Sequence, residues 1–199
     1  LELPLMILKL AIENGSKLFI NTDTFFELSG DADQKDFNYI KSKKEFLKLA
    51  QSITGNKIKF VNLRLEHIYG PDDNPTKFIH FLIKELRQGK IVDFNSGEQE
   101  RDFIFIEEAS SAVLETIKHF KNLEEWEEFG IGTGKTHSIR EFGEKLQKST
   151  NTSGSIKWGV KPYSPGENMY SKADLSNDKK INWACKYSLE DGKEKTINP

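Results

Sequence analysis

The residues best suited to acid–base chemistry in this chain are Tyr39 and Lys43, four positions apart in DFNYIKSKKEF, residues 36–46. Residues with this spacing share one face of an α-helix. A phenol ordinarily titrates near pH ~10, so it exchanges protons poorly at neutral pH unless a nearby cation favours the phenolate. Lys43 supplies such a cation. The pair therefore fits a proton-transfer site, although the same spacing is common on solvated helix surfaces and both interpretations stay open on spacing alone.

A hydroxyl that hydrogen-bonds the same reacting oxygen would complete such a site. Thr22 follows the apolar run KLFI, residues 17–20, which predicts a short buried strand leading into a polar segment, NTDT. In open α/β sheets, active sites lie at the carboxyl ends of the strands. Thr22 is therefore the hydroxyl that we expect beside Tyr39.

Helical and strand patterns alternate along the chain and must position these side chains. The patterns predict helices near the N-terminus and over 36–54, 75–90, 107–120, 138–149 and 188–197, and strands over 17–20, 58–65, 90–95, 101–106 and 129–134. Capping boxes, Ser138 with Glu141 and Ser188 with Asp191, mark two helix starts. The alternation predicts an α/β fold with a parallel sheet covered on both faces.

Composition excludes several classes of function. The chain has 29 Lys and Arg against 31 Asp and Glu, a net charge of −2, and no segment carries the basic excess that nucleic-acid binding requires. One cysteine, Cys185, excludes an internal disulfide and a cysteine metal cage, and the histidines lack ligand spacing. No apolar run is long enough to span a bilayer, and the first segment lacks the features of a signal peptide. We therefore expect a cytoplasmic protein without a metal site.

One motif of dinucleotide-binding α/β domains is missing from the expected place. Such domains begin with a strand and a glycine-rich phosphate loop, G-x-G-x-x-G or a variant. Residues 1–60 contain no such loop, and GIGTG at 130–134 has a different spacing.

Seven segments in order nevertheless resemble the extended short-chain dehydrogenase/reductase family of nucleotide-sugar enzymes. They are FINTD, YIKSK, LRLEHIYGP, RDFIFIEEA, FGIGTG with SIREF, PGENMYSKADLS, and the tryptophan before YSLEDGKEKTI. Within the family, the LRLEHIYGP and PYSPGENMYSKADLS forms are most similar to the subgroup of CDP-abequose and CDP-paratose synthases, which reduce 4-keto-6-deoxy sugar nucleotides. The resemblance implies the carboxyl-terminal part of a Rossmann-like parallel sheet, plus a smaller α/β substrate-binding domain.

The resemblance also implies roles for individual residues. Thr22, Tyr39 and Lys43 are similar to the family's catalytic trio, with Tyr39 as the acid/base at the sugar oxygen and Lys43 holding the nicotinamide ribose of NAD or NADP. Further contacts to the cofactor are implied for Leu65 and His67. Contacts to a nucleotide-sugar substrate are implied for Asp23, Thr24, His67, Lys77, Arg101 and Lys161.

Some positions depart from the family pattern. Thr24 stands where the family's dehydratases carry a glutamate for a second acid–base step, so the resemblance does not imply dehydration. His67 replaces an asparagine that usually touches the substrate, and it is either a substrate contact or a packed histidine. Arg101 matches an arginine that binds the nucleotide diphosphate, and a guanidinium fork suits that anion. Ser164 replaces the family's second diphosphate arginine, with Lys161 as a stand-in.

The implied organisation is a partial dinucleotide-binding domain over 1–72, to which 101–134 returns, and a substrate-binding lobe over 73–100 and 135–199. Two hypotheses follow from the missing loop. In the first, the chain is part of a nucleotide-sugar 4-ketoreductase or 4-epimerase and acts with a complementing N-terminal segment. In the second, it is a non-catalytic nucleotide-sugar-binding or interaction module with relic catalytic residues. A homodimer through the 36–54 helix is a further expectation.

Overall fold

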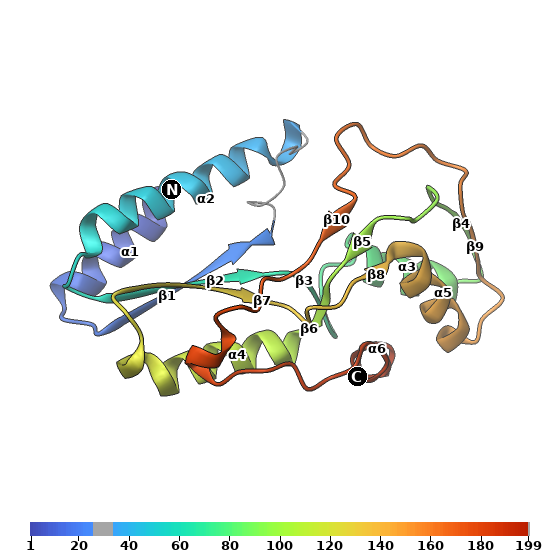
Figure 1. Ribbon diagram of the computed structural model, residues 1–199. Coiled ribbons are helices and arrows are strands. Elements are labelled where there is room, and N and C mark those ends of the chain that lie inside the picture. The colour runs from blue at the N-terminus through green and yellow to red at the C-terminus, as the bar shows by residue number, and fades with distance from the viewer. Residues whose placement is uncertain (26–33, 199) are drawn as a thin grey trace.

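The computed structural model describes residues 1–25 and 34–198, which form two layered parts that meet near the middle of the molecule (Figure 1). The helices are α1 Glu2–Glu13, α2 Gln34–Thr54, α3 Phe78–Arg87, α4 Ile106–His119, α5 Ile139–Thr150 and α6 Leu189–Ile197. The longer strands are β1 Leu18–Thr24, β2 Lys59–Leu65 and β7 Trp126–Ile131. The short strands are β3 His67–Tyr69, β4 Ile91–Asp93, β5 Glu100–Arg101, β6 Phe103–Phe105, β8 His137–Ser138, β9 Ser155–Lys157 and β10 Tyr170–Ser171. Within the described residues, no helix is both long and apolar enough to cross a membrane.

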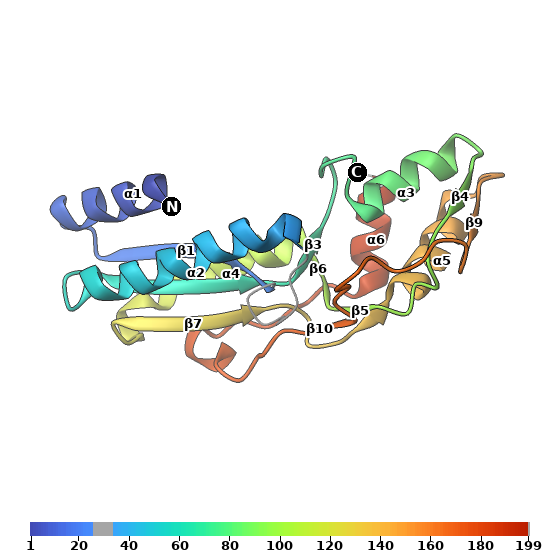
Figure 2. The ribbon, with the colours of Figure 1, turned by 90° about the horizontal axis from the view of Figure 1, so that it is seen from above.

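The first part is a parallel sheet with the strand order β1-β2-β7. Helices α1 and α2 cover one face and α4 covers the other, as Figures 1 and 2 show together. Alternation along β2 explains the two layers. Phe60 packs with Leu8 and Phe46 on the α1–α2 side. Val61 and Leu63 belong to the cluster on the opposite face. The predicted parallel α/β sheet with both faces covered is confirmed.

The expectation that NTDT follows the first strand as a polar segment is wrong. β1 continues through Thr24, which pairs with Leu65 of β2. The buried Asp23 is compatible with a strand because its carboxylate accepts hydrogen bonds from the backbone N–H of Thr24 (2.8 Å) and the side-chain amide of Asn62 (3.1 Å). The backbone of NTDT is paired with β2, and the buried carboxylate of Asp23 is hydrogen-bonded. Polar residues that the sequence suggests lie in solvent are therefore accommodated inside the sheet.

The second part packs α3, α5 and α6 around an aromatic and aliphatic core that includes Tyr69, Leu82 and Phe142. Its strands are only two or three residues long, which is too short to give a readable hydrophobic period. The predicted strand over 58–65 is confirmed as β2, and a separate short strand, β3, follows it. The predicted strand over 101–106 is more broken than expected, because it splits into β5 and β6.

Glu66 and Asp102 stand at these two breaks, where pairing changes from β2–β7 to β3–β6. The N–H of Glu66 still bonds to Ile131 of β7 (3.0 Å), whereas the N–H of His67 bonds to the carbonyl oxygen of Asp102 (3.1 Å). The carboxylate of Asp102 then accepts from the backbone N–H groups of Thr133 and Gly134, 2.8 and 2.9 Å away. The two acids thus join the main sheet to the second part.

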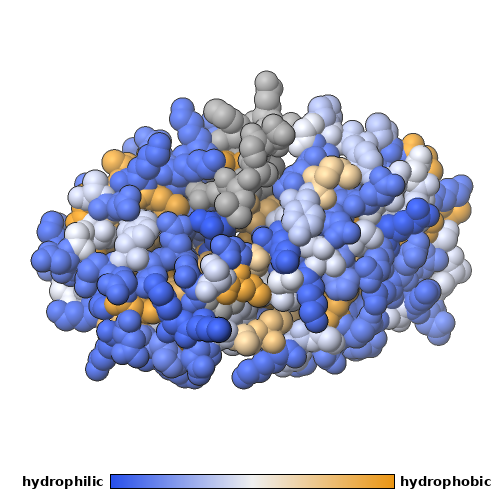
Figure 3. Space-filling view, in the orientation of Figure 1, coloured by the Kyte–Doolittle hydropathy of each residue, from blue (hydrophilic) through white to orange (hydrophobic). Residues whose placement is uncertain are grey.

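The predicted helix starts agree with the structure. The Ser138 hydroxyl accepts from the N–H of Glu141, and Ser188 and Asp191 form a reciprocal capping box. The face of the molecule seen in Figure 3 is largely hydrophilic, with hydrophobic residues in small separate areas.

Candidate active site

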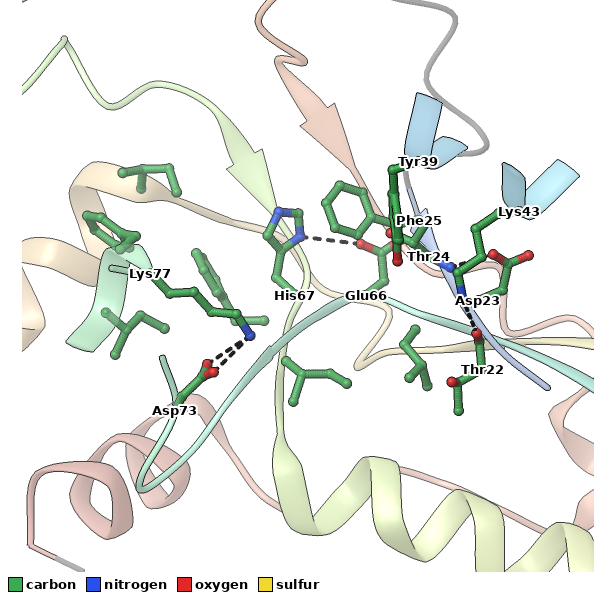
Figure 4. Close-up of a pocket in the computed structure, with 16 residues that line it drawn as sticks. Thr22, Asp23, Thr24, Phe25, Tyr39, Lys43, Glu66, His67, Asp73 and Lys77 are labelled. Carbon is green, nitrogen blue, oxygen red and sulfur yellow. Dashed lines mark hydrogen bonds and ion pairs between the residues drawn. The ribbon is translucent and has the colours of Figure 1, made fainter. Parts of the chain in front are cut away.

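A cavity of about 510 Å³ opens at the carboxyl ends of β1 and β2, where the two parts meet. This volume is in the range of small-molecule sites. Its lining combines residues from both parts (Figure 4): Thr22, Asp23, Thr24, Phe25, Tyr39, Lys43, Leu65, Glu66, His67, Ile68, Asp73, Lys77, Phe78, Ile79, Phe103 and Ile139. Eight of the ten residues predicted for the site are in this wall, and Arg101 and Lys161 are not.

Thr22, Tyr39 and Lys43 lie together at one end of the cavity. The Lys43 ammonium donates a 2.7 Å hydrogen bond to the backbone carbonyl oxygen of Thr22, and it lies 5.8 Å from the centre of the Tyr39 ring. Tyr39 is 48% exposed. The predicted trio therefore shares one wall, with the cation next to the phenol.

Asp23 and Thr24 face inward beside this trio, and both are buried. Asp23, only 4% exposed, uses both carboxylate oxygens in hydrogen bonds to Thr24 and Asn62. A second amide, from Asn21, donates to the Asn62 oxygen at 2.7 Å. Through these hydrogen bonds Asp23 stabilises the end of β1, and it also lines the cavity.

His67 lies in the middle of the wall and packs against aromatic rings. Its ring centre is 3.9 Å from that of Phe25 and 5.9 Å from that of Phe103. Burial, and after it the nearby Arg101 cation, lower the pKa of His67 to about 3, so the imidazole is neutral at physiological pH. His67 is therefore a packed ring that also lines the cavity, and its contact with a substrate stays a prediction.

Glu66 is a site residue that the sequence did not suggest. Its side chain is 3% exposed and accepts a 2.6 Å hydrogen bond from the Ser171 hydroxyl. Burial raises its pKa to about 7, well above the ordinary value of 4.5. The motif LRLEHIYGP contains the residue, but only the break between β2 and β3 reveals that it turns inward.

Lys77 lies at the far end of the cavity, just before α3. Its ammonium is 2.9 Å from Asp73, which follows the YGP turn, and Figure 4 shows the pair across the wall from Lys43. Two lysines therefore stand at separated ends of one cavity, and an elongated anionic ligand would meet a cation at each end.

Arg101 and Lys161 occupy different surroundings. The Arg101 side chain is 7% exposed, and its guanidinium donates to the backbone carbonyl oxygens of Glu100 and Asn168 and pairs with Glu167. Lys161 is exposed, and its backbone N–H donates to the backbone carbonyl oxygen of Phe94. The predicted diphosphate contacts of both residues stay predictions, with the Arg101 fork already bonded within the protein.

Solved structures share this fold. UDP-glucose 4-epimerase from Thermotoga maritima, crystallised with UDP-glucose, superposes with a TM-score of 0.81 at 23% identity and covers 97% of this chain. UDP-glucuronic acid 4-epimerase from Bacillus cereus, in complex with UDP-glucuronic acid and NAD, superposes with a TM-score of 0.79 at 25% identity and covers 96%. This chain spans 66% and 64% of those two chains.

Sequence comparison agrees. CDP-abequose synthases of Salmonella muenchen and Salmonella typhimurium are 32% and 33% identical over 98% of this chain, which spans 67% and 66% of their lengths. The model of the NAD dependent epimerase/dehydratase family matches residues 2–132. These matches confirm the resemblance to extended short-chain dehydrogenases/reductases that act on nucleotide sugars. The chain belongs to the NAD-dependent epimerase/dehydratase family.

Proposed function

We propose that this chain forms the catalytic and substrate-binding part of an NAD(P)-dependent nucleotide-sugar 4-ketoreductase, in which Tyr39 is the acid/base. The observation that supports this most strongly is the meeting of Tyr39, Lys43 and Thr22 at one end of a cavity of ligand size. Two CDP-abequose synthases align with 98% of this chain. Because that subgroup reduces 4-keto sugar nucleotides, the similarity favours a reductase.

In this proposal the phenol of Tyr39 gives its proton to the sugar C4 oxygen as the ketone becomes an alcohol. Lys43, 5.8 Å from the phenol ring, favours the phenolate that remains and lowers the cost of the transfer. The Thr22 hydroxyl bonds to the same oxygen and fixes its position. Lys77, at the opposite end of the cavity, faces the diphosphate of the nucleotide.

NADH or NADPH supplies the hydride that C4 receives when the cofactor is bound. The residues present fit its nicotinamide side: Lys43 has an ammonium that can also reach a ribose hydroxyl, and Leu65 and His67 line the cavity beside it. We also propose a division of the chain into two parts. Residues 1–72 and 101–134 would hold the cofactor, and residues 73–100 and 135–199 would hold the substrate.

Two alternatives make different predictions. A 4-epimerase is favoured by the fold shared with UDP-sugar 4-epimerases, and it would return the hydride to the same sugar. A non-catalytic binding module would hold a nucleotide sugar without turnover. A homodimer through the 36–54 helix, or a complementing N-terminal segment, would complete the assembly in either case.

Cofactor binding and turnover separate these functions. The 199-residue chain, and any longer protein that contains it, should be titrated with NADH and NADPH while nicotinamide fluorescence is followed, and then given a 4-keto-6-deoxy sugar nucleotide. A reductase consumes the reduced cofactor in equal amount to the product. An epimerase converts UDP-sugars without net consumption. Nucleotide-sugar binding without either reaction would refute the enzymatic proposal and support the binding module.

A further inference from the structure

Glu66 is a buried carboxyl group in the cavity wall that the proposed Tyr39 chemistry does not use. One of its oxygens, Oε2, accepts the hydrogen bond from Ser171 and lies 3.6 Å from Nδ1 of His67. Figure 4 shows this oxygen facing the histidine ring. A movement of about 0.5 Å brings the two atoms within hydrogen-bond distance.

The His67 ring has a buried nitrogen atom, Nδ1, that needs a hydrogen-bond partner. Its Nδ1 is buried and has no hydrogen-bond partner among the described residues, which is costly for a polar atom. The Phe25 ring lies tilted by 32° against one side of the imidazole and Phe103 meets it edge-on, so the ring is packed on two sides. The other nitrogen, Nε2, points away from Glu66 in Figure 4. About a quarter of the side chain, 24%, is exposed, and Nδ1 contributes almost nothing to it.

We propose that Glu66 is a positioning residue that decides which nitrogen of His67 carries the hydrogen, and so whether Nε2 offers the cavity a hydrogen-bond donor or an acceptor. Only the identity of the ligand that meets Nε2 rests on the proposed function. The relation between Glu66 and His67 belongs to the protein alone.

The two states follow from hydrogen-bond chemistry. When Glu66 is ionised it can only accept, so Nδ1 carries the hydrogen and donates to it, and Nε2 is left as an acceptor. When Glu66 is protonated it can donate to Nδ1, so the hydrogen moves to Nε2, which becomes a donor suited to a ketone oxygen. Because the pKa of Glu66 is about 7, both states are populated near neutral pH. Because the pKa of His67 is about 3, the ring is neutral in both, and the pair is not an ion pair.

The surrounding charged and polar groups come from three strands, from the break between β5 and β6, and from the start of α3. Asp102, between β5 and β6, raises the pKa of Glu66, whereas Arg101 of β5 and Arg64 of β2 lower it. The Ser171 hydroxyl of β10 also lowers it, because its hydrogen bond favours the carboxylate. Around His67, Arg101 and Lys77 oppose a positive charge and Asp102 favours one. Desolvation is the largest cause for both groups, so these neighbours adjust the balance and do not reverse it.

Nitrogen NMR of the imidazole rings tests the assignment without substrate or turnover. The protein, with ¹⁵N-labelled histidine, should be titrated from about pH 5.5 to about pH 8.5, and a His67→Asn variant identifies the His67 signals among the four histidines. We expect the hydrogen to move from Nε2 to Nδ1 with a midpoint near pH 7. Glu66→Gln, which copies the protonated acid, should keep the hydrogen on Nε2 throughout. Ser171→Ala should move the midpoint to higher pH, since it removes a bond that lowers the pKa of Glu66.

Three results would overturn the proposal: a His67 hydrogen position independent of pH in the wild type, an unchanged transition in Glu66→Gln, or formation of an imidazolium in this range. If Glu66→Gln does not fold, the direction of the Ser171→Ala shift still decides. Absence of enzymatic turnover would refute the proposed function alone and leave this NMR result standing. If both proposals hold, the affinity for a 4-keto sugar nucleotide should fall above the midpoint in the wild type and stay constant in Glu66→Gln.

Discussion

The ammonium of Lys43 lies 2.7 Å from the carbonyl oxygen of Thr22 and 5.8 Å from the ring centre of Tyr39. One side chain thus joins the end of β1 to the helix α2 that carries the phenol. The hydrogen bond links the cation to the backbone of the strand and places its charge next to Tyr39.

Tyr39→Phe should reduce turnover by a factor of about 10²–10⁴, because it removes the only atom of the ring that can carry a proton. The midpoint of thermal unfolding should stay within error of the wild type, since Tyr39 is 48% exposed and the ring is retained. Single-turnover measurements with a 4-keto sugar nucleotide provide the rate. Tyr170→Phe, at another exposed tyrosine outside the cavity, is the matched control. A Tyr39→Phe protein with near-wild-type rate would remove Tyr39 from the chemistry.

Lys43→Met should lower both cofactor affinity and turnover, because it removes the cation beside the phenol and the donor to Thr22. The free energy of unfolding should fall by no more than about 1 kcal/mol, the usual net value of one hydrogen bond. Fluorescence titration with NADPH and chemical denaturation measure the two effects. Lys41→Met changes the same charge on an exposed position of α2 and should leave both quantities unchanged. Equal losses in the two variants would point to overall charge and not to the site.

Much of the main sheet could be predicted from sequence, because its strands and helices are long enough to show a period. The run 58–65 and the helical stripe of Phe46 and Ala50 give the β2 strand and the buried face of α2 directly. The extension of β1 through Thr24 could not be predicted, since it depends on pairing with a strand 41 residues away and on Asn62 as a partner for Asp23.

The candidate site divides in the same way. Tyr39 and Lys43 are linked by helical spacing, so local pattern is enough to pair them. Glu66 depends on a change of strand partners that places a charged residue inside the protein, and nothing in the surrounding residues signals it. Arg101 differs again: its position in the motif suggests a ligand contact, which stays a prediction, and its hydrogen bond to the carbonyl oxygen of Asn168, far along the chain, could not be foreseen from local pattern.

Asp23→Ala should lower the free energy of unfolding by about 1–3 kcal/mol, because it removes the carboxylate oxygen to which the buried side-chain amide of Asn62 donates. Asp23→Asn keeps an acceptor oxygen and should recover most of that loss. Thr22→Val changes the neighbouring exposed position and should have little effect on stability. Urea denaturation measures all three variants. If Asp23→Asn instead retains full stability but loses nucleotide-sugar affinity, the carboxylate acts on the ligand, as the sequence predicts.

Glu66 and His67 should influence stability in opposite directions as pH changes. The pKa of Glu66 is raised from 4.5 to about 7, so between these values the folded protein holds a proton that the unfolded chain has lost. The contribution of Glu66 to the free energy of unfolding therefore falls as pH rises through this window. The pKa of His67 is lowered from 6.5 to about 3, so below pH 6.5 the unfolded chain takes up a proton that the folded protein does not. The contribution of His67 therefore rises with pH up to 6.5.

Between about pH 5 and about pH 6.5 the fall in the Glu66 contribution and the rise in the His67 contribution nearly cancel in the wild type. A variant that removes one of the two groups should reveal the pH dependence of the other. Relative to wild type, Glu66→Gln should gain stability as pH rises through this range, and His67→Asn should lose it. Each change should reach at most about 2 kcal/mol, since each group contributes up to about 1.4 kcal/mol per pH unit. Urea denaturation at the two pH values measures the difference, with Glu115→Gln as a control at a partly exposed glutamate outside the cavity. Variants whose curves run parallel to the wild type would show that neither group titrates as its burial requires.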